Sequence, residues 1–476
     1  MATIKYIPTI GLEIHAELKT KTKMFCRSKN DSDEERPNVN ICPICMGHPG
    51  TLPVINKEAV RHVLRVGAAV GGELADFTEF DRKSYFYPDI PKGYQISQYK
   101  YPLVSGGRLA GVELTRIHLE EDTARSSHDY GEYSLVDFNR AGVPLMELVT
   151  EPVIHSAEQA GRFARELRLL LRYLGASDAN MEKGEMRVEA NISISDKAGV
   201  FGTKVEVKNL NSFRSVERAI AYELNRHEEL LSSGEKVAQE TRGWDEANQK
   251  TYPQRMKEEA HDYRYFPDPD LPKLLISEIP EFAQDKLNLP ELPWVKRERY
   301  KKDFAMTDDA AALFVEYPEA ARFIEAVEKN LPDKSALALA INYSASDIIG
   351  LAKADKDVDQ VFASLRFSPE NFSELIKMVH DKKLSSRGAK DTLAIMYKNG
   401  GEPASVAASA GLIQKSDEGE LKAIVEKILE NNSKVVSDYK SGKESALQFL
   451  IGQGMKATKG AANPEMLKAI VRSIIG

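Results

Sequence analysis

Acidic and imidazole side chains gather in short stretches of the sequence that otherwise look like buried strands. The first stretch is RIHLEED at residues 116–122, and the second is PLMEL at residues 144–148, where Glu147 is the one charged residue of an apolar run. A carboxylate in such surroundings is costly to bury unless a cation, a metal ion or hydrogen-bond donors meet it. The sequence therefore predicts a positive charge beside Glu147.

A third stretch near the N-terminus, GLEIHAEL at residues 11–18, has the same character. Its strict alternation predicts a strand with aliphatic side chains on one face and Glu13 and His15 on the other. Carboxylates with one or two imidazoles suit Mg²⁺ or Mn²⁺ better than a thiolate site would. The candidate active-site residues are Glu13, His15, His118, Glu120, Glu121, Asp122 and Glu147.

Three cysteines form a second candidate site. Cys42 and Cys45 have the spacing of a zinc knuckle, and Cys26 could supply a third thiolate. The four-cysteine pattern is incomplete, so three small buried hydrophobic residues are an alternative interpretation. A redox pair is disfavoured because no thioredoxin-like strand and helix surround the motif.

Cations alternate with aromatic rings in FDRKSYFYPDIPKGYQISQY, residues 80–99. Such a pattern suits stacking on bases and pairing with phosphates, so we expect Arg82 and Lys83 to bind a nucleotide. The strand pattern TKVEVKN adds Glu206 and Lys208 to the same surface. A proline-bent loop with its rings packed on the domain, and a solvated sheet face, are the alternative interpretations.

The order of helix and strand patterns predicts the domain organisation. Alternating strands mixed with capped amphipathic helices predict an α+β domain with an antiparallel sheet at residues 1–294. Helical patterns continue through residues 295–402, and a small helical tail at residues 403–476 follows the break NGGEP. The end of the tail is locally basic, which could serve phosphate binding, although a solvated helix face is the commoner meaning of such charge.

Composition narrows the class of protein. The net charge of −7 argues against a broadly basic surface but leaves room for a local patch that binds nucleic acid. We expect a cytoplasmic protein, because neither a signal peptide nor a membrane-spanning run is recognisable. The sequence also lacks a P-loop and an amidase or glutaminase nucleophile. If the protein uses ammonia, another subunit must make it.

The sequence resembles the GatB family, the B subunits of bacterial-type aspartyl/glutamyl-tRNA amidotransferases, over essentially its whole length. The motifs that carry the resemblance are GLEIHAELKTKTKMFC, CPICMGHPGTLPVIN, FDRKSYFYPDIPKGYQISQ, RIHLEEDTARS, YSLVDFNRAGVPLMELVTEP, KVEVKNLNSF, DYRYFPDPDLP and FLIGQGMKATKGAANP. The resemblance implies a cradle domain related to glutamine synthetase and guanidino kinases, then a helical domain and a GatB/YqeY-type tail. Both predicted boundaries agree with that plan.

The chemistry implied by the resemblance explains the acidic residues. ATP and Mg²⁺ would phosphorylate the side-chain carboxylate of misacylated Glu-tRNA(Gln), Asp-tRNA(Asn) or both, and ammonia would then displace phosphate. The family motifs assign Mg²⁺ to His15, Glu121 and Glu147, and make Glu13 and Glu120 candidates for a second metal or for orienting the first ligands. Glu13, Glu120 and Glu147 are the expected catalytic residues. Strict alternation, however, puts Glu120 rather than Glu121 on the face of His118, unless a bulge intervenes.

The resemblance also implies partners. Ammonia would come from the glutaminase subunit GatA, with GatC as a third subunit, and the cognate non-discriminating synthetase is a further candidate. Many relatives carry Cys-x-Cys where this chain has Cys26-Arg27-Ser28, so a structural Zn²⁺ would lack one usual ligand. The tail lysines Lys443, Lys456 and Lys459 are expected to grip tRNA. Two alternatives are a non-catalytic tRNA-binding scaffold and a ligase acting on free amino acids.

Overall fold

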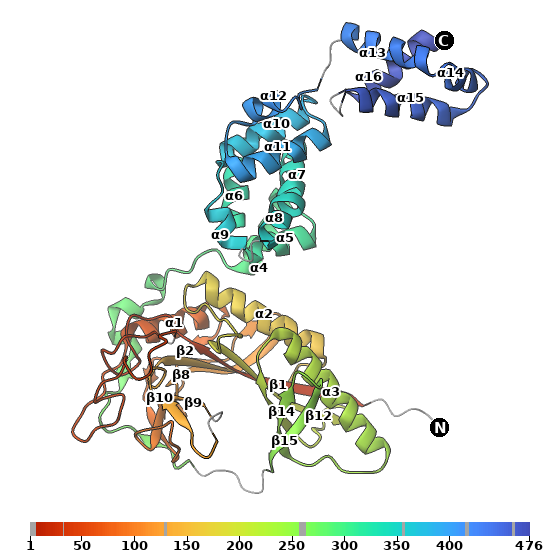
Figure 1. Cartoon of the computed structure of the whole chain (residues 1–476). Coiled ribbons are helices and arrows are strands. Elements are labelled where there is room, and N and C mark those ends of the chain that lie inside the picture. The colour runs from red at the N-terminus through yellow and green to blue at the C-terminus, as the bar shows by residue number, and fades with distance from the viewer. Residues whose placement is uncertain are drawn as a thin grey trace. The chain divides into compact units, whose positions relative to one another are not determined.

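The computed structural model of the chain describes most of its residues. The described residues are 6–31, 33–127, 131–256, 263–354, 358–414, 418–458 and 462–476. The chain divides into two compact units, Met1–Leu292 and Pro293–Gly476 (Figure 1). The first unit is mixed α+β and the second is helical. A further division at residue 403 stays a prediction.

A ten-stranded sheet forms the centre of the first unit. Its order is β15-β14-β13-β12-β1-β11-β8-β6-β2, with β7 paired to β8, and every pairing is antiparallel except that of β13 with β14. Its strands are β1 Ile7–Glu17, β2 Glu73–Leu74, β6 Val104–Ser105, β7 Arg108–Leu109, β8 Val112–Glu121, β11 Pro144–Thr150, β12 Met186–Ser195, β13 Val205–Leu210, β14 Glu240–Asp245 and β15 Lys250–Met256. The predicted antiparallel character is therefore confirmed for most of the sheet.

The central strand β1 shows why the sheet has two different faces. Ile10, Leu12 and Ile14 are fully buried, and they alternate with the polar residues of the other face. Helix α2 (Ala157–Tyr173) packs on α3 (Phe213–Ser232), and α3 contacts β12. Helix α1 (Lys57–Ala69) contacts β8 (Figure 1).

Helix α2 begins as the sequence predicts. The side chain of Ser156 accepts a hydrogen bond from the backbone N–H of Gln159, at 3.1 Å. This bond satisfies one of the donors that every helix start leaves open. The Gln159 side chain in turn accepts from the backbone N–H of His155, so the reciprocal bond lies one residue earlier than in a standard capping box.

Three small sheets flank the large one. Strand β4 pairs with β5 and β16, β3 pairs with β17, and β9 pairs with β10. The bounds are β3 Phe77–Thr78, β4 Asp81–Ser84, β5 Tyr94–Ser97, β9 Arg125–Ser127, β10 Leu135–Asp137, β16 Phe266–Pro267 and β17 Leu274–Leu275. The short 3₁₀ helices η1 Ile276–Glu278, η2 Pro280–Phe282 and η3 Gln284–Lys286 follow. Because β5 contacts β8, the cation-rich strand β4 lies close to the large sheet.

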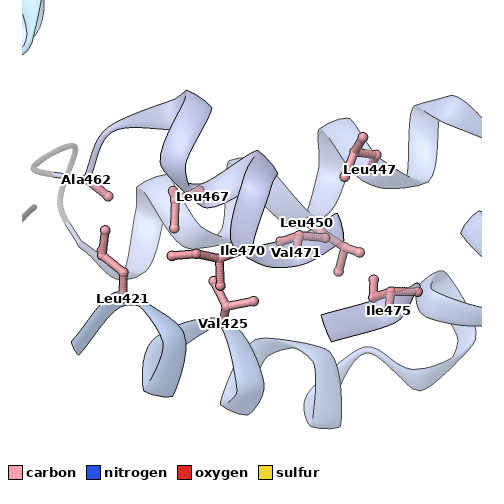
Figure 2. Packing of buried hydrophobic residues seen from close by; sticks show 9 residues of the cluster. All are labelled: Leu421, Val425, Leu447, Leu450, Ala462, Leu467, Ile470, Val471 and Ile475. Atoms are coloured by element: carbon pink, nitrogen blue, oxygen red, sulfur yellow. The ribbon is translucent and has the colours of Figure 1, made fainter. Parts of the chain in front are cut away.

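The second unit consists of helices in its described part. They are α4 Pro293–Asp303, α5 Asp308–Glu316, α6 Pro318–Glu328, α7 Lys334–Tyr343, the π-helix η4 Ser344–Ile348, α8 Ile349–Ala354, α9 Val358–Ala363, α10 Pro369–His380, α11 Ser386–Asn399, α12 Pro403–Ser409, α13 Glu418–Asn431, α14 Ser433–Lys440, α15 Glu444–Ala457 and α16 Pro464–Ile475. Figure 2 shows how side chains of α13, α15 and α16, including Val425, Leu450 and Val471, meet in one buried cluster. Among the described residues, no helix combines the length and apolar character needed to cross a membrane.

Candidate active site

The strand register places the predicted acidic residues in one row. His15 of β1 lies opposite Glu147 of β11, and Glu147 lies opposite His118 of β8. Directly opposed residues of antiparallel strands share a sheet face, so the three side chains stand side by side. Glu13 and Glu120 fall on the same face by alternation along β1 and β8. We call Glu13, His15, His118, Glu120 and Glu147 the acidic cluster.

The distances within the acidic cluster are short but exceed those of good hydrogen bonds. His15 Nε2 lies 3.4 Å from Glu147 Oε2, 3.7 Å from Glu120 Oε1 and 3.8 Å from Glu13 Oε1. His118 Nε2 lies 3.6 Å from Glu147 Oε2. The predicted cation beside Glu147 is present, since Arg116 Nη2 lies 3.3 Å from Glu147 Oε1.

Burial and mutual charge shift the pKa values of the cluster apart. Burial, with the charge of Glu147, raises the pKa of Glu120 to about 7. Burial lowers the pKa of His118 to about 4. Burial also acts to lower the pKa of His15, but its contact with Glu147 and the charge of Glu120 outweigh burial and raise this pKa to about 9. Burial opposes ionisation of Glu147, yet His118 and His15 hold its pKa below the ordinary value.

The donor set fits a divalent cation. Ligand atoms of Glu13, His15 and Glu147 lie within 4.8 Å of one another, and so do those of His118, Glu120 and Glu147. The pKa of Glu120 is raised because its carboxylate is buried beside that of Glu147. A bound metal ion would offset the repulsion between these two carboxylates. Carboxylate oxygens with imidazole nitrogens are ligands suited to Mg²⁺ or Mn²⁺. The residues present therefore fit such an ion.

Glu121 does not join the acidic cluster. It follows Glu120 in β8 and so points to the opposite face, where its carboxylate accepts a hydrogen bond from the Lys92 ammonium and another, at 2.9 Å, from the Ile96 N–H. A cavity of about 250 Å³ on that side is lined by Glu121, Lys92 and Cys45 among others. The strand stays regular through Glu121, and therefore Glu120 takes the position beside His118 that alternation assigns.

The four residues expected to bind a nucleotide lie in different surroundings. Arg82 is bound by Asp268 at 2.7 Å and Asp270 at 2.9 Å, so its charge is already met. Burial opposes ionisation of Lys83, but the charge of Glu120 outweighs it and raises the pKa of Lys83. Lys83 lies on β4, which pairs with β5, and β5 contacts the β8 strand that carries Glu120.

The other two expected residues continue the same sheet face through β12. Lys208 contacts Glu189 at 2.6 Å and Glu206 at 3.4 Å. Glu206 also accepts a hydrogen bond from Thr241 at 2.8 Å. Glu189 lies directly opposite Glu13 in the register of β1 and β12, so this group borders the acidic cluster.

The three cysteines come together. Ligand atoms of Cys26, Cys42 and Cys45 lie within 4.8 Å of one another, and the Sγ atoms of Cys42 and Cys45 are 3.8 Å apart. The hydrogen bond from Cys26 lowers the pKa of Cys45 to about 5. Ser28 Oγ lies 3.9 Å from Cys45 Sγ, at the position where the resemblance expects a further cysteine. The group could hold a metal ion, with Ser28 in place of a thiolate.

The tail lysines are exposed where they are described. Lys443 forms an ion pair with Asp438 at 3.0 Å, and Lys456 lies near the end of α15. Lys459 lies outside the described residues. Binding of tRNA by these lysines stays a prediction.

Sequence reasoning missed several residues that contact the acidic cluster. Arg116 shares the parity of His118 and Glu120 in RIHLEED, so alternation alone could have identified it. Ser97, in strand β5, donates a hydrogen bond to the carboxylate of Glu120 at 3.2 Å. Nothing in the sequence indicated a role for Ser97, because its strand is too short to show a periodic pattern.

Fold and site together define an α+β protein whose large sheet carries an acidic cluster that could hold a divalent cation. Residues 8–280 match the model of the GatB/GatE catalytic domain, and residues 322–475 match that of the GatB domain. The chain is 43% identical to the B subunit of the aspartyl/glutamyl-tRNA(Asn/Gln) amidotransferase of Brevibacillus brevis, over 99% of both chains. It is 42% identical to the protein of that name from Persephonella marina, over 99% of this chain and all of the other. The chain belongs to the GatB/GatE family.

Proposed function

We propose that the chain is the B subunit of a tRNA-dependent amidotransferase, a ligase of translation. It activates the side-chain carboxylate of misacylated Glu-tRNA(Gln), Asp-tRNA(Asn) or both with ATP, and the activated group is then amidated. The names of its relatives support the substrate class. The single observation that carries the chemistry is the row of His15, Glu147 and His118, with Glu120 beside it. We further propose that the first unit has the cradle fold of glutamine synthetase and that the protein works in the cytoplasm.

His15, Glu120 and Glu147 would hold Mg²⁺, with Glu13 close by, and Glu120 replaces Glu121 in the ligand set. When bound, Mg²⁺ neutralises the phosphate oxygens of ATP during phosphoryl transfer. Arg116 orients Glu147 through their contact at 3.3 Å.

The surrounding residues serve the phosphates and the reacting carboxylate. Lys83 and Lys208 supply positive charge at the border of the acidic cluster, where the phosphates of ATP must enter. Burial of the cluster keeps water from the activated carboxylate, because Glu120 and Glu147 are 3% and 6% exposed. Arg82 acts by holding its loop through Asp268 and Asp270 rather than by binding phosphate.

Ammonia is supplied by a glutaminase subunit of the GatA type, with GatC as a third partner. The tail lysines Lys443, Lys456 and Lys459 contact the tRNA body, and the cognate synthetase is a further partner. The group of Cys26, Cys42 and Cys45 holds a structural Zn²⁺. Cys26 and Cys45 line a cavity together with Glu121, whose side chain points to the face of β8 opposite the acidic cluster. The Zn²⁺ would therefore lie apart from the site where ATP reacts.

The test is amide formation on purified misacylated tRNA with ATP, Mg²⁺ and ammonium chloride, which removes the need for glutaminase. We expect Glu147→Ala to bind tRNA but to form neither amide nor ADP. Glu113→Ala, an exposed carboxylate of the same β8 strand, is the matched control and should behave as wild type. Normal turnover by Glu147→Ala would make the chain a scaffold whose chemistry belongs to another subunit.

A further inference from the structure

A continuous series of aromatic rings begins beside the acidic cluster and ends at the protein surface. The Lys83 ammonium lies 5.0 Å from the centre of the Tyr263 ring. Tyr263 contacts Tyr265 with ring centres 6.1 Å apart, and Tyr265 stacks on Tyr99 with centres 4.3 Å apart. The rings of Tyr265 and Tyr99 are 13° from parallel.

The series lies close to the cluster, because Ser97, two residues before Tyr99 in the chain, donates a hydrogen bond to Glu120 at 3.2 Å. Burial raises the pKa of Tyr265 to about 12; the charge of Lys83 opposes this rise, and the charges of Glu120 and Glu147 add to it. The outer end is open, since Tyr99 is 63% exposed. The series therefore connects the site of carboxylate chemistry to solvent.

Tyr99 is exposed but held in place. Its backbone N–H donates to Asp81 Oδ2 at 3.0 Å, and Asp81 is buried. Its ring is fixed by the stack on Tyr265. A large ring left mostly in water and yet fixed in orientation is a ready surface for another flat ring, because little conformational entropy is lost on binding.

The substrate of the proposed function carries such a ring at a fixed place. The amino acid is joined by an ester to the terminal ribose of tRNA, so only a few covalent bonds separate its side-chain carboxylate from the 3′-terminal adenosine. If that carboxylate reacts at the acidic cluster, the terminal adenine must lie next to the cluster. The bases of the tRNA 3′ end are single-stranded, and unpaired bases are recognised by stacking on aromatic side chains.

We propose that the stacked pair Tyr99 and Tyr265 binds the adenine of the 3′-terminal adenosine of aminoacyl-tRNA and so positions the aminoacyl group at the acidic cluster. This inference rests on the proposed function. Nearby Lys100, with its ammonium 5.1 Å from the Tyr101 ring, supplies positive charge for the adjoining phosphate. The adenine of ATP has the same chemistry, and the experiment therefore separates the two sources.

The experiment measures binding of uncharged tRNA(Gln), intact or lacking its terminal adenosine, to the full-length chain with the partner proteins that copurify with it. For wild type we expect removal of the adenosine to weaken binding about tenfold. For Tyr99→Ala we expect intact tRNA to bind about tenfold more weakly than to wild type, with no further loss on removing the adenosine. An unchanged tenfold loss in Tyr99→Ala would overturn the proposal, as would a wild type that does not distinguish the two tRNAs.

Two control variants separate stacking from damage to the fold. Tyr99→Phe keeps the ring and should retain wild-type binding. Phe201→Ala removes a ring that is 67% exposed in the β12–β13 connection, and it should also bind as wild type. Weak binding by Phe201→Ala would mean that any exposed ring contributes, which contradicts a specific role for the stacked pair.

A second arm distinguishes the two sources of adenine. In the amidation assay we expect Tyr99→Ala to raise the KM for misacylated tRNA about tenfold while leaving the KM for ATP and kcat unchanged. A raised KM for ATP with unchanged tRNA binding would overturn the assignment to tRNA. The comparison of intact and shortened tRNA measures binding and needs no turnover, so its result does not depend on the activity of Glu147→Ala. Normal activity of Glu147→Ala would refute the proposed function and leave the binding result standing.

Discussion

Two groups of buried carboxylates in the first unit differ in how their charge is met. One is the acidic cluster. The other, here the Glu223 network, consists of Glu223, Arg226 and His227 of α3 with Glu240 and Arg242 of β14. Glu223 meets Arg226 at 2.7 Å and Arg242 at 3.2 Å, and Arg242 meets Glu240 at 2.6 Å.

In the Glu223 network, two guanidinium groups approach two carboxylates at hydrogen-bonding distances. In the acidic cluster, imidazoles lie 3.4 to 3.8 Å from the carboxylates, and the possible ligand atoms of two groups of three residues lie within 4.8 Å of one another. Two guanidinium groups meet two carboxylates in the Glu223 network, whereas Arg116 meets one of the three carboxylates of the acidic cluster. A surplus of carboxylates leaves capacity for a bound cation. Because carboxylates in both groups are buried, we expect the balance of charge, more than burial itself, to separate a structural group from one that binds an ion.

The strongest test of this difference is a variant that neutralises one carboxylate of the acidic cluster. We expect Glu120→Gln to lower the rate of amide formation by at least about 100-fold, because a metal ligand is lost. Stability should stay the same or rise, because repulsion between Glu120 and Glu147 is removed. Urea unfolding alongside the amidation assay checks both; a large loss of stability would assign the cluster a structural role.

The matching change in the Glu223 network should do the opposite. Glu223→Gln leaves Arg226 and Arg242 without a buried countercharge, so we expect the free energy of unfolding to fall by about 3 kcal/mol. Activity per folded molecule should be unchanged. Glu217→Gln on the same helix, whose partner Arg165 is largely exposed, is the control and should cost less than about 1 kcal/mol.

Acid should separate the two groups as well. Burial opposes ionisation of Glu223, but hydrogen bonds from His227 and Arg226 lower its pKa from 4.5 to about 2. A lowered pKa in the folded state means that the stabilisation is complete above about pH 4.5 and is lost as pH falls toward 2. Between about pH 6 and about pH 3 this loss is worth about 2 kcal/mol, and it should vanish in Glu223→Gln. Chemical unfolding at each pH measures the difference, and equal slopes in both proteins would contradict it.

The smallest expected effect is stabilisation by metal. Adding Mg²⁺ to the full-length chain should raise the Tm of the first transition by about 2 °C, since only the folded acidic cluster binds the ion. Glu120→Gln should lose this shift and Glu223→Gln should keep it. Calorimetry with and without chelator makes the comparison, and a shift that survives in Glu120→Gln would place the ion elsewhere.

Sequence patterns predicted much of the sheet and its acidic face. Alternation identified β1 and β13, and it placed Glu120 beside His118. The ligand set implied by resemblance named Glu121 instead, and the structure does not bring Glu121 to the cluster. Strand alternation alone therefore predicted which side chain of β8 faces the acidic cluster.

The Glu223 network could not be predicted in the same way. Glu223 and His227 are four residues apart on α3, but their partner strands β14 and β15 contain Gly243 and Pro253, which strand patterns disfavour. Their register also shifts between Thr241 and Arg242. The stacked pair joins Tyr99 to Tyr265 across a sequence separation that no periodicity bridges. Such pairings follow from the tertiary fold.

The place of β1 in the sheet affects how the protein can be made. It precedes the other described strands of the sheet in sequence, yet its two neighbours are β11, at residues 144–150, and β12, at residues 186–195. The polar face of β1 can therefore form only after much of the first unit has been synthesised. Pairing β1 with strands so distant in sequence requires the closure of long loops. A nascent chain that stops before residue 186 exposes an edge of β1, and such an edge invites pairing with other chains. The acidic cluster is thus one of the last parts of the first unit to assemble, and chaperone binding to nascent chains should peak before β12 emerges.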